Sequence, residues 1–227
     1  MKPQKAYILR TTDPRSRAYA QICADSCDRV GLPWEYFEGY EGLTNQTVWE
    51  HFPVPGLRVG YRMNDPAACA TAGHMAIWKK IWDNNECAVI LEHDALMLHP
   101  IDMDIPDNVI VSLGYKFQDY ENYDWTAAGP PTKIQLIRRF SGAHAYCITA
   151  KTAELLFDEI KIRGIEVAID NFYFMRINTP TCIASDVPLA IMLPTPAICW
   201  LRESTIWVEP STLNYDVLED FSRYYRQ

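Results

Sequence analysis

The sequence predicts a single α/β domain in which helices flank a mostly parallel β-sheet. Short apolar runs alternate along the chain with segments of helical periodicity, which is the pattern of βα units. With 227 residues the chain is long enough for one well-filled domain and short for two. Hydrophobic residues make up 48% and charged residues 22% of the sequence, which is an ordinary globular balance.

The first part of the chain predicts two strands with a helix between them. Residues 6–9 form the first strand pattern, and residues 15–30 show a helical pattern that ends at a glycine and a proline. Residues 34–37 form the second strand pattern. Because residues 45–61 contain two prolines and two glycines, we expect an irregular surface segment there.

A longer helix begins at Asp65. Asp65 is the expected N-cap and Pro66 the first helical residue, a combination that favours a helix start. Apolar residues and His74 then recur at intervals of three and four, so one face of the helix is expected to be buried. An Asp-Asn-Asn sequence at residues 83–85 ends the pattern.

The next strand carries the first candidate site. Residues 87–91 are apolar without interruption, and Glu92, His93 and Asp94 follow at once. Open α/β sheets bind their ligands at the carboxyl ends of strands. Alternate residues of an extended segment project together, so both carboxylates are placed to bind one divalent cation that also binds diphosphate oxygens. Acidic residues that are merely solvated at a strand end give the same pattern.

The second half continues the alternation. Residues 109–113 and 143–149 predict strands, and residues 151–161 predict an amphipathic helix. Between the two strands, residues 115–133 are aromatic and polar and include a Gly-Pro-Pro sequence. Long loops of this kind often act as lids over a site. Trp125 lies in this loop, where its indole ring is placed to pack against a ligand.

Two acidic residues of the last third follow apolar runs. Asp170 ends the run at residues 167–171, where a carboxylate without a partner would be costly, and Asp186 follows a short apolar run. Residues 183–193 and 197–201 predict further short strands.

Charge and cysteine content limit the classes of function. A formal net charge of -8 argues against nonspecific binding to nucleic acid or to an anionic membrane. No apolar run approaches the roughly 20 residues of a transmembrane helix, and no signal-peptide pattern is present. Seven cysteines without a Cys-x-x-Cys pair favour reduced, structural thiols. We therefore expect a cytoplasmic protein.

Several segments, in order, resemble glycosyltransferase family 25, the lipopolysaccharide and collagen-type galactosyltransferases. The resemblance rests on AYILRTTDPRSR, WEYFEGYEG, GHMAIWKKIWDNNECAVILEHDALML, SGAHAYCITAKTAELLFDEI, VAIDNFYF and RESTIW. These segments run from about residue 6 to about residue 207, over most of the chain. Each motif is moderately specific, and their ordered co-occurrence carries the resemblance.

The resemblance implies a GT-A type fold in one domain. Residues 1–114 would form the donor-binding half, and residues 115–227 the acceptor-binding and catalytic half. It further implies transfer of a hexose, galactose or glucose first, from a UDP-linked donor to a glycan or other carbohydrate with inversion. A divalent cation is implied, Mn²⁺ ahead of Mg²⁺.

The residue patterns and the resemblance together name the candidate site residues. Donor binding is expected from Arg10, Thr11, Arg15, Arg17, His74, Glu92 and Asp94. The expected metal ligands are Glu92, His93, Asp94 and His144. Asp170 is the expected general base, with Asp186 in reserve, and Trp125 is expected to bind the acceptor.

The sequence departs from the family pattern at three positions. Glu92-His93-Asp94 stands where the family has Glu-Asp-Asp, Gly73-His74 where it has Ser-His, and Leu9 or Arg10 where it has Asn. Either His93 replaces an aspartate ligand, which softens the site toward manganese, or it points away and the two carboxylates suffice.

Each candidate also has a purely structural interpretation. His74 lies at helical spacing among apolar residues, and His144 lies among small residues near a strand, so both suit a hydrogen-bonded core histidine. Asp170 suits the N-cap of a following helix. Arg15 and Arg17 suit a solvated surface.

Three other functions compete with a glycosyltransferase. A metal-dependent nucleotidyltransferase usually needs a glycine-rich loop after the first strand, and residues 10–14 contain no glycine. A degenerate transferase that binds glycans or a partner enzyme is supported by the altered Glu-His-Asp triplet. A zinc hydrolase is disfavoured because the sequence has no His-Glu-x-x-His motif.

Overall fold

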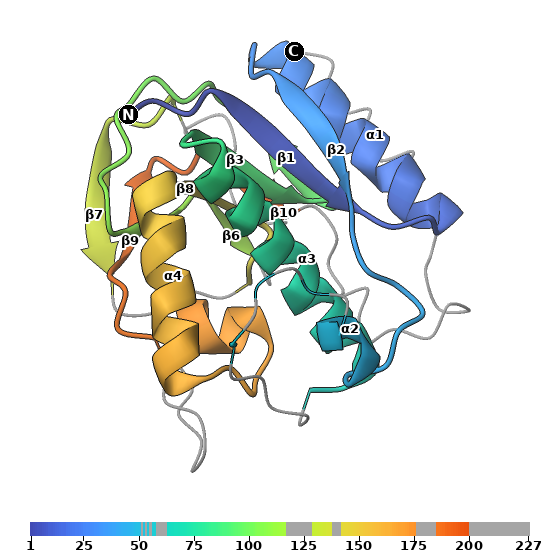
Figure 1. The fold of residues 1–227 in the computed structure, drawn as a ribbon. Helices are drawn as coiled ribbons and strands as arrows, with labels where there is room; N and C mark the ends of the chain where they lie inside the picture. Colours follow the sequence, from blue (N-terminus) through green and yellow to red (C-terminus); the bar gives the residue numbers. More distant parts are fainter. Residues whose placement is uncertain are drawn as a thin grey trace.

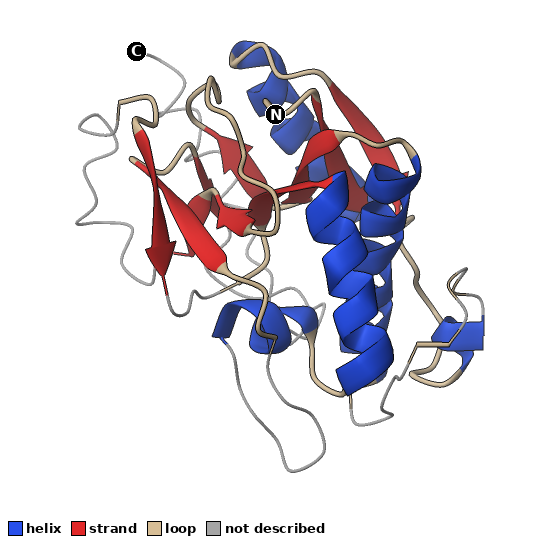
Figure 2. Cartoon of the chain, turned by 60° about the vertical axis from the view of Figure 1, so that its left-hand side comes forward, coloured by secondary structure: helices blue, strands red, loops and turns tan. Residues whose placement is uncertain are grey.

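The apolar runs of the sequence form one twisted β-sheet with helices packed on both faces (Figure 1 and Figure 2). The computed structural model describes residues 1–50, 52, 54, 56–57, 63–116, 129–137, 142–175 and 185–199. Within this part of the chain, the sheet takes seven strands in the order β2-β1-β3-β8-β5-β9-β7. The predicted α/β class is confirmed, and the arrangement is consistent with a GT-A type fold.

Five strands of the sheet share one direction. They are β1 (Lys5–Arg10), β2 (Trp34–Glu38), β3 (Cys87–Glu92), β5 (Ile110–Ser112) and β9 (Leu189–Leu193). The other two run the opposite way: β8 (Ala145–Thr149) between β3 and β5, and β7 (Lys133–Ile137) beside β9. The sheet is thus mostly parallel, and it joins strands from both expected halves of the chain.

Side-chain alternation along β1 shows how the two faces are covered. Tyr7 and Leu9 pack into the core beneath α3 (Asp65–Asp83) and α4 (Ala150–Arg163), which lie side by side on one face. Ala6 and Ile8 point to the other face, where α1 (Pro14–Arg29) packs. Successive residues of a strand point to opposite faces, so a run of apolar residues is buried on both sides.

A small second sheet extends the layer of α1. In the described residues it has the order β4-β10-β6, formed by β4 (Ala95–Met97), β10 (Ala197–Cys199) and β6 (Gly114–Lys116). Gly114 is required for the close approach of its strands, because a Cβ atom there would lie 2.2 Å from the carbonyl oxygen of Ala197.

Short polar side chains cap the three long helices. The Asp13 carboxylate accepts a hydrogen bond from the Arg15 N–H and caps α1, and Thr149 caps α4. At α3 the cap is Asn64, whose Oδ1 accepts from the Ala67 N–H at 2.9 Å. The expectation that Asp65 is the N-cap was wrong by one residue; both side chains are short acceptors suited to that position.

The segment expected to be irregular contributes to the core. It contains the short helix α2 (Thr47–Glu50), and Val48, Phe52 and Val54 are buried with the residues of α3 and α4. Prolines and glycines exclude regular structure but do not exclude burial, so composition alone misjudged this segment. Residues 117–128, with Trp125, lie outside the described residues.

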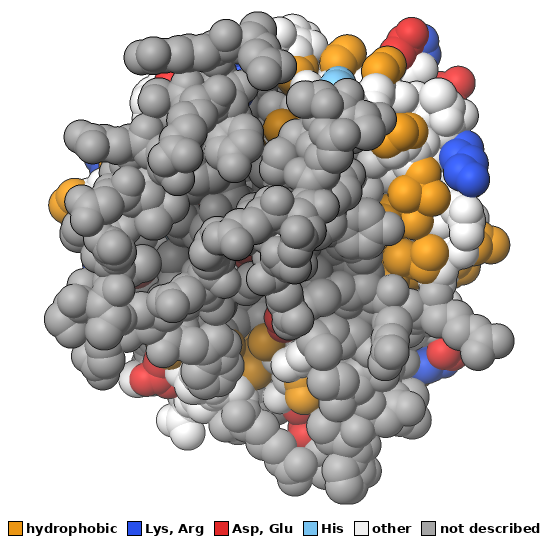
Figure 3. Space-filling view, turned by 180° about the vertical axis from the view of Figure 1, so that it is seen from behind, with side chains coloured by type: hydrophobic (Ala, Val, Ile, Leu, Met, Phe, Trp, Pro, Cys, Tyr) orange, Lys and Arg blue, Asp and Glu red, His pale blue; other side chains and the backbone are white. Residues whose placement is uncertain are grey.

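Few large apolar side chains of the described residues are exposed. Described hydrophobic side chains reach the surface along one edge of the face seen in Figure 3. Among the described residues, the exposed large ones are Met1, Leu136 and Ile162, which belong to three separate segments. Single exposed apolar side chains are ordinary in globular proteins, so we assign them no binding role. No described helix has the length and apolar character to cross a lipid bilayer.

Candidate functional site

A cavity of about 740 Å³ opens at one edge of the large sheet. The carboxyl ends of β1, β2 and β3 meet there, together with the first turns of α1 and α3. Because β8 runs the opposite way, its amino end at residues 142–144 reaches the same edge. Residues 168–171 and Cys199 also line the cavity, so segments from far apart in the sequence converge on it.

Glu92 stands at the exit of β3. Its N–H donates to the carbonyl oxygen of His144 at 2.8 Å, which ties β3 to the residue before β8. One carboxylate oxygen, Oε1, lies 3.1 Å from Nε2 of His74. Burial raises the pKa of Glu92, but the hydrogen bond from His74 and the nearby His144 and His93 outweigh it, so the pKa is lowered. Glu92 therefore lines the cavity as a carboxylate.

Asp94 does not continue the strand. Residues 93–94 form a turn between β3 and β4, so the expected projection of Glu92 and Asp94 from one extended segment was wrong. The Asp94 side chain is nearly buried, and the Cys199 thiol donates to its Oδ2 at 3.4 Å. His93 stacks on Tyr19, with ring centroids 6.0 Å apart. All three residues of the Glu92-His93-Asp94 sequence nevertheless line the same cavity.

Two histidines take different places. His144 lines the cavity, is 2% exposed, and packs against Gly114, where an added Cβ would lie 3.0 Å from Nε2. His74 is fully buried behind Glu92, between that carboxylate and the hydroxyl of Tyr146. The two interpretations of His74 therefore combine: it is a hydrogen-bonded core histidine that contacts a cavity residue.

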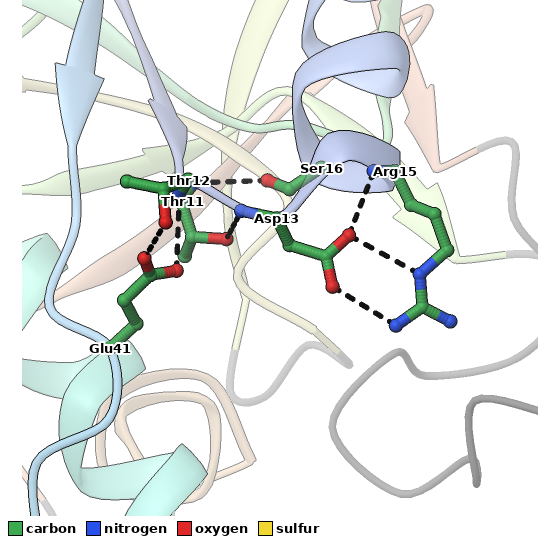
Figure 4. A network of polar contacts seen from close by, with 6 residues as sticks. All are labelled: Thr11, Thr12, Asp13, Arg15, Ser16 and Glu41. Atoms are coloured by element: carbon green, nitrogen blue, oxygen red, sulfur yellow. Dashed lines mark hydrogen bonds and ion pairs between the residues drawn. The ribbon is translucent and has the colours of Figure 1, made fainter.

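The loop between β1 and α1 is held by hydrogen bonds to its neighbours (Figure 4). The Thr11 N–H donates to Ser16 Oγ at 3.0 Å, and the Thr12 N–H donates to Glu41 Oε2 at 3.1 Å. The Thr12 hydroxyl also donates to Glu41, which lowers the pKa of that carboxyl. The loop is thus shaped by side-chain acceptors in the absence of glycine.

The expected donor arginines already contact carboxylates. Figure 4 shows the Arg15 guanidinium turned toward Asp13, with Nη2 and Oδ2 3.0 Å apart. Arg10 pairs with Glu38 at 2.8 Å and lies 3.5 Å above the centre of the Tyr36 ring. Both arginines line the cavity. Arg17 is half exposed, lies 3.9 Å from Glu38, and is not part of the described lining.

Asp170 and Asp186 lie at different places in the fold. Asp170 is the first residue of the π-helical turn η2 (Asp170–Met175), and its Oδ1 accepts from the Asn171 N–H at 2.8 Å. It lines the cavity. Asp186 precedes the amino end of β9, at the opposite edge of the sheet, where it pairs with Arg163 and its side chain is 74% exposed. The reserve assignment of Asp186 as base is therefore not supported by its position.

The described lining has a surplus of carboxylates. The acidic residues are Asp13, Glu41, Asp65, Glu92, Asp94 and Asp170, and the arginines are Arg10 and Arg15. No group of three His, Cys, Asp or Glu side chains among the described residues is arranged to hold a metal ion. The expected ligands Glu92, His93, Asp94 and His144 therefore do not form a metal site by themselves, although a cation bound through one or two carboxylates and substrate phosphates needs no such group.

Sequence reasoning overlooked several polar residues that shape the cavity. They are Ser16, Glu41, Thr71, Tyr146 and Cys199. Thr71 accepts a hydrogen bond from the Ile169 N–H at 3.2 Å and so supports the backbone before Asp170. Apart from Ser16, which contacts Thr11 five residues away, these residues have partners that are distant in the sequence, which leaves no local pattern to find.

Comparison with known proteins leaves the family open. No protein-family model matches the chain, and no curated protein matches it. Among solved structures, it is similar to a crystal structure of a glycosyltransferase involved in the glycosylation of the major capsid of PBCV-1. That likeness has 11% sequence identity and a TM-score of 0.34, and covers 68% of this chain and 66% of that one. A likeness of this strength does not bear on the chemistry of the cavity, and the resemblance to family 25 stays a prediction.

Proposed function

We propose that the protein is a glycosyltransferase that moves a hexose from a UDP-linked sugar to a carbohydrate acceptor with inversion. One observation carries the proposal: Glu92 and Asp94 at the exit of β3 line the same cavity as Asp170. The cavity lies at the carboxyl ends of three parallel strands, where open α/β sheets bind ligands. Its volume is in the range of small-molecule sites.

The donor side is assigned to the edge formed by β1 and β3. Glu92 and Asp94 would hold a divalent cation, Mn²⁺ ahead of Mg²⁺, and the cation would neutralise charge on the nucleoside diphosphate as it departs. The carboxylate surplus of the described lining supports this assignment, because a diphosphate without a counterion would be repelled. Arg10 and Arg15 are close enough to the cavity to contact the donor if their present pairs exchange.

Asp170 is assigned the role of general base. Inversion requires the acceptor hydroxyl to attack from the face opposite the leaving diphosphate, and a base must take the hydroxyl proton. Asp170 enters the cavity from the segment after α4, whereas Glu92 and Asp94 enter from β3. The proposed base and the proposed cation ligands therefore come from different segments that line one cavity. Trp125 remains the proposed acceptor contact.

The free cysteines support a reducing compartment such as the cytoplasm. Cys23, Cys27, Cys69, Cys87, Cys147 and Cys199 are all free and buried. Disulfides are typical of oxidising compartments, and none forms among these six thiols although Cys87 and Cys147 have their sulfurs 3.7 Å apart.

Thermal unfolding with nucleotide-sugars tests the proposal. UDP-galactose and UDP-glucose, each with Mn²⁺, should raise the melting temperature, since a ligand at a hundred times its Kd stabilises by about 2.7 kcal/mol. Asp94→Asn should abolish the Mn²⁺-dependent part of the shift while keeping the native melting temperature without ligand. Equal shifts for the variant and the native protein, or full transfer activity in chelator, would contradict the cation assignment.

A catalytically weakened transferase that binds glycans is the second candidate. It is favoured by the near-burial of Asp94 and by its contact with Cys199, which leave this carboxylate little access to a cation. Slow hydrolysis of the donor in the absence of acceptor separates the two functions. A live transferase releases free sugar and UDP, and a binding protein leaves the donor intact.

A further inference from the structure

A chain of hydrogen bonds leads from the core of the protein to Glu92. Trp78 Nε1 donates to the Tyr146 hydroxyl at 2.8 Å. That hydroxyl lies 2.9 Å from Nδ1 of His74, and Nε2 of His74 lies 3.1 Å from Oε1 of Glu92. The first three side chains are fully buried, whereas the Glu92 side chain is 29% exposed and lines the cavity.

The donors and acceptors of this hydrogen-bond chain determine which nitrogen of His74 carries the proton. An indole N–H can only donate, so the Tyr146 oxygen accepts from Trp78. The Glu92 carboxylate can only accept, so Nε2 of His74, which faces it, carries a proton. In a neutral imidazole Nδ1 is then an acceptor, and it can accept the phenolic proton of Tyr146. Every group in the chain is satisfied in this arrangement.

The packing around the chain makes it rigid. His74 and Tyr146 stack with ring centroids 5.7 Å apart, and Trp78 packs edge-on against Tyr173 and Phe157. His74 and Trp78 lie one turn apart on α3, and Tyr146 lies on β8, next to β3. The helix and the sheet therefore hold the same polar chain from two sides.

We propose that Trp78, Tyr146 and His74 act as positioning residues that hold one oxygen of Glu92 and orient its carboxylate toward the cavity. The role of Glu92 in binding a cation and nucleotide rests on the proposed function, whereas the hydrogen-bond chain does not. Substitution of a group that holds a metal-binding side chain in place typically lowers metal affinity or activity about 10–100-fold.

The protonation pattern is tested by nitrogen-15 NMR of protein labelled at its histidines. The protein contains five histidines, so the His74 signals are assigned by their loss in His74→Gln. We expect one neutral tautomer with the proton on Nε2. Tyr146→Phe removes the partner of Nδ1 and leaves the Glu92 carboxylate, so the proton should stay on Nε2 while the nitrogen-15 shift of Nδ1 changes with the lost hydrogen bond. A native His74 with its proton on Nδ1 alone, or an Nδ1 shift unchanged in Tyr146→Phe, would overturn the hydrogen-bond chain.

The positioning role is tested with two matched variants. The amide nitrogen of His74→Gln reaches about as far as Nε2 and keeps a donor for Glu92, whereas that of His74→Asn reaches only to the Nδ1 position. Binding of Mn²⁺ with UDP should weaken about 10–100-fold in His74→Asn and in Tyr146→Phe, and less in His74→Gln. Circular dichroism confirms that each variant is folded, and Tyr146→Phe supplies the readout if a His74 variant does not fold.

The outcomes separate this inference from the proposed function. If the native protein binds no Mn²⁺ with UDP, the proposed function fails, and the nitrogen-15 NMR experiment alone decides whether the hydrogen-bond chain exists. If the native protein binds them and His74→Gln loses as much affinity as His74→Asn, the positioning role is wrong and the proposed function stands.

Discussion

Single residues of the cavity act through groups that their neighbours supply. Asp170 has its Oδ1 on the Asn171 N–H, and the preceding Ile169 N–H is held by Thr71. Gly114 contributes by having no side chain, because β10 and His144 occupy the space that a Cβ atom would need. The chemistry of each residue follows from its surroundings, so each prediction at this scale removes one group and keeps the rest.

Asp170→Asn should lower kcat about 10²–10⁴-fold, the usual contribution of general-base catalysis. The reason is that an amide cannot take the proton of the attacking hydroxyl group. Donor affinity should be unchanged, since the proposed donor contacts are Glu92 and Asp94 and the substitution leaves both in place. Steady-state transfer assays with both substrates varied measure the two effects. Asp186→Asn is the matched control and should keep native kcat, because its side chain is exposed at the opposite edge. Native rates for Asp170→Asn would remove it from catalysis.

Gly114→Ala should destabilise the protein by about 1–3 kcal/mol or more, because overpacking forces the backbone to shift. The added Cβ would lie 2.2 Å from the Ala197 carbonyl oxygen and 3.0 Å from His144 Nε2. Urea unfolding measures the loss. Gly129→Ala serves as the control, since a Cβ there meets no described atom within 4 Å. Equal stabilities of the two variants would show that β6 and β10 do not approach as closely as described.

Helices and strands bring the cavity residues to one edge. The first turn of α1, the exit of β3 and the start of β8 arrive together because β8 is antiparallel to β3. Helix α3 serves both sides of the cavity: Thr71 supports the backbone before Asp170, and His74 contacts Glu92. These two positions are three residues apart, on the same face of the helix.

The cap of α1 predicts a pH dependence of stability. The hydrogen bond from the Arg15 guanidinium lowers the pKa of Asp13, whereas an unfolded aspartate titrates near about 3.9. In acid the folded chain therefore binds fewer protons at this site than the unfolded chain, and the free energy of unfolding rises with pH. The contribution is fully present above the unfolded pKa and is lost as the pH falls through the folded one.

Two substitutions of Asp13 separate the effect of the helix cap on stability from the effect of the carboxylate charge. Asp13→Ala should cost about 0.5–2 kcal/mol at neutral pH, because the Arg15 N–H loses its acceptor. Asp13→Asn keeps a capping oxygen and should cost less, and its stability should vary less with pH between about 5 and 2. Chemical denaturation at a series of pH values measures both. A pH profile of Asp13→Asn identical to that of the native protein would contradict the assignment.

At the scale of the whole molecule, two cores pack against the opposite faces of one sheet. The core beneath α3 and α4 is rich in aromatic side chains, and the core beneath α1 holds Cys23, Cys27, Cys87 and Cys147. Burial raises the pKa of the Cys23 and Cys147 thiols well above their ordinary range. Thiols of this kind react slowly, because the thiolate is the reactive form.

The buried thiols should therefore report cooperative unfolding. In Cys182→Ser, which removes the cysteine outside the described residues, a thiol-specific reagent at neutral pH should label none of the four cysteines beneath α1 rapidly in the native state. These four cysteines should react in denaturant, with the same midpoint as the loss of circular dichroism. Their fast labelling without denaturant, identified by mass spectrometry of peptides, would show that the core beneath α1 opens independently of the other core.

Local pattern was sufficient for much of the fold. The apolar runs at residues 6–9 and 87–91 predicted β1 and β3, and helical periodicity predicted α1, α3 and α4 within a few residues. Regular elements follow from periods that are visible in short windows of sequence. Burial of residues 48–54 was missed, because it depends on what packs against them and not on their own propensity.

For the site, the sequence alone determined which carboxylates are candidates, since Glu92, Asp94 and Asp170 each follow an apolar run. Only the tertiary structure decided which residues lie beside them. It placed Asp170 in the cavity and Asp186 at the opposite edge, turned Asp94 toward Cys199, and joined His74 to Glu92 through contacts with β3 and β8. The physical reason is that strand order and strand direction set which distant residues share an edge, and hydrogen bonds across that edge have no signature in local sequence.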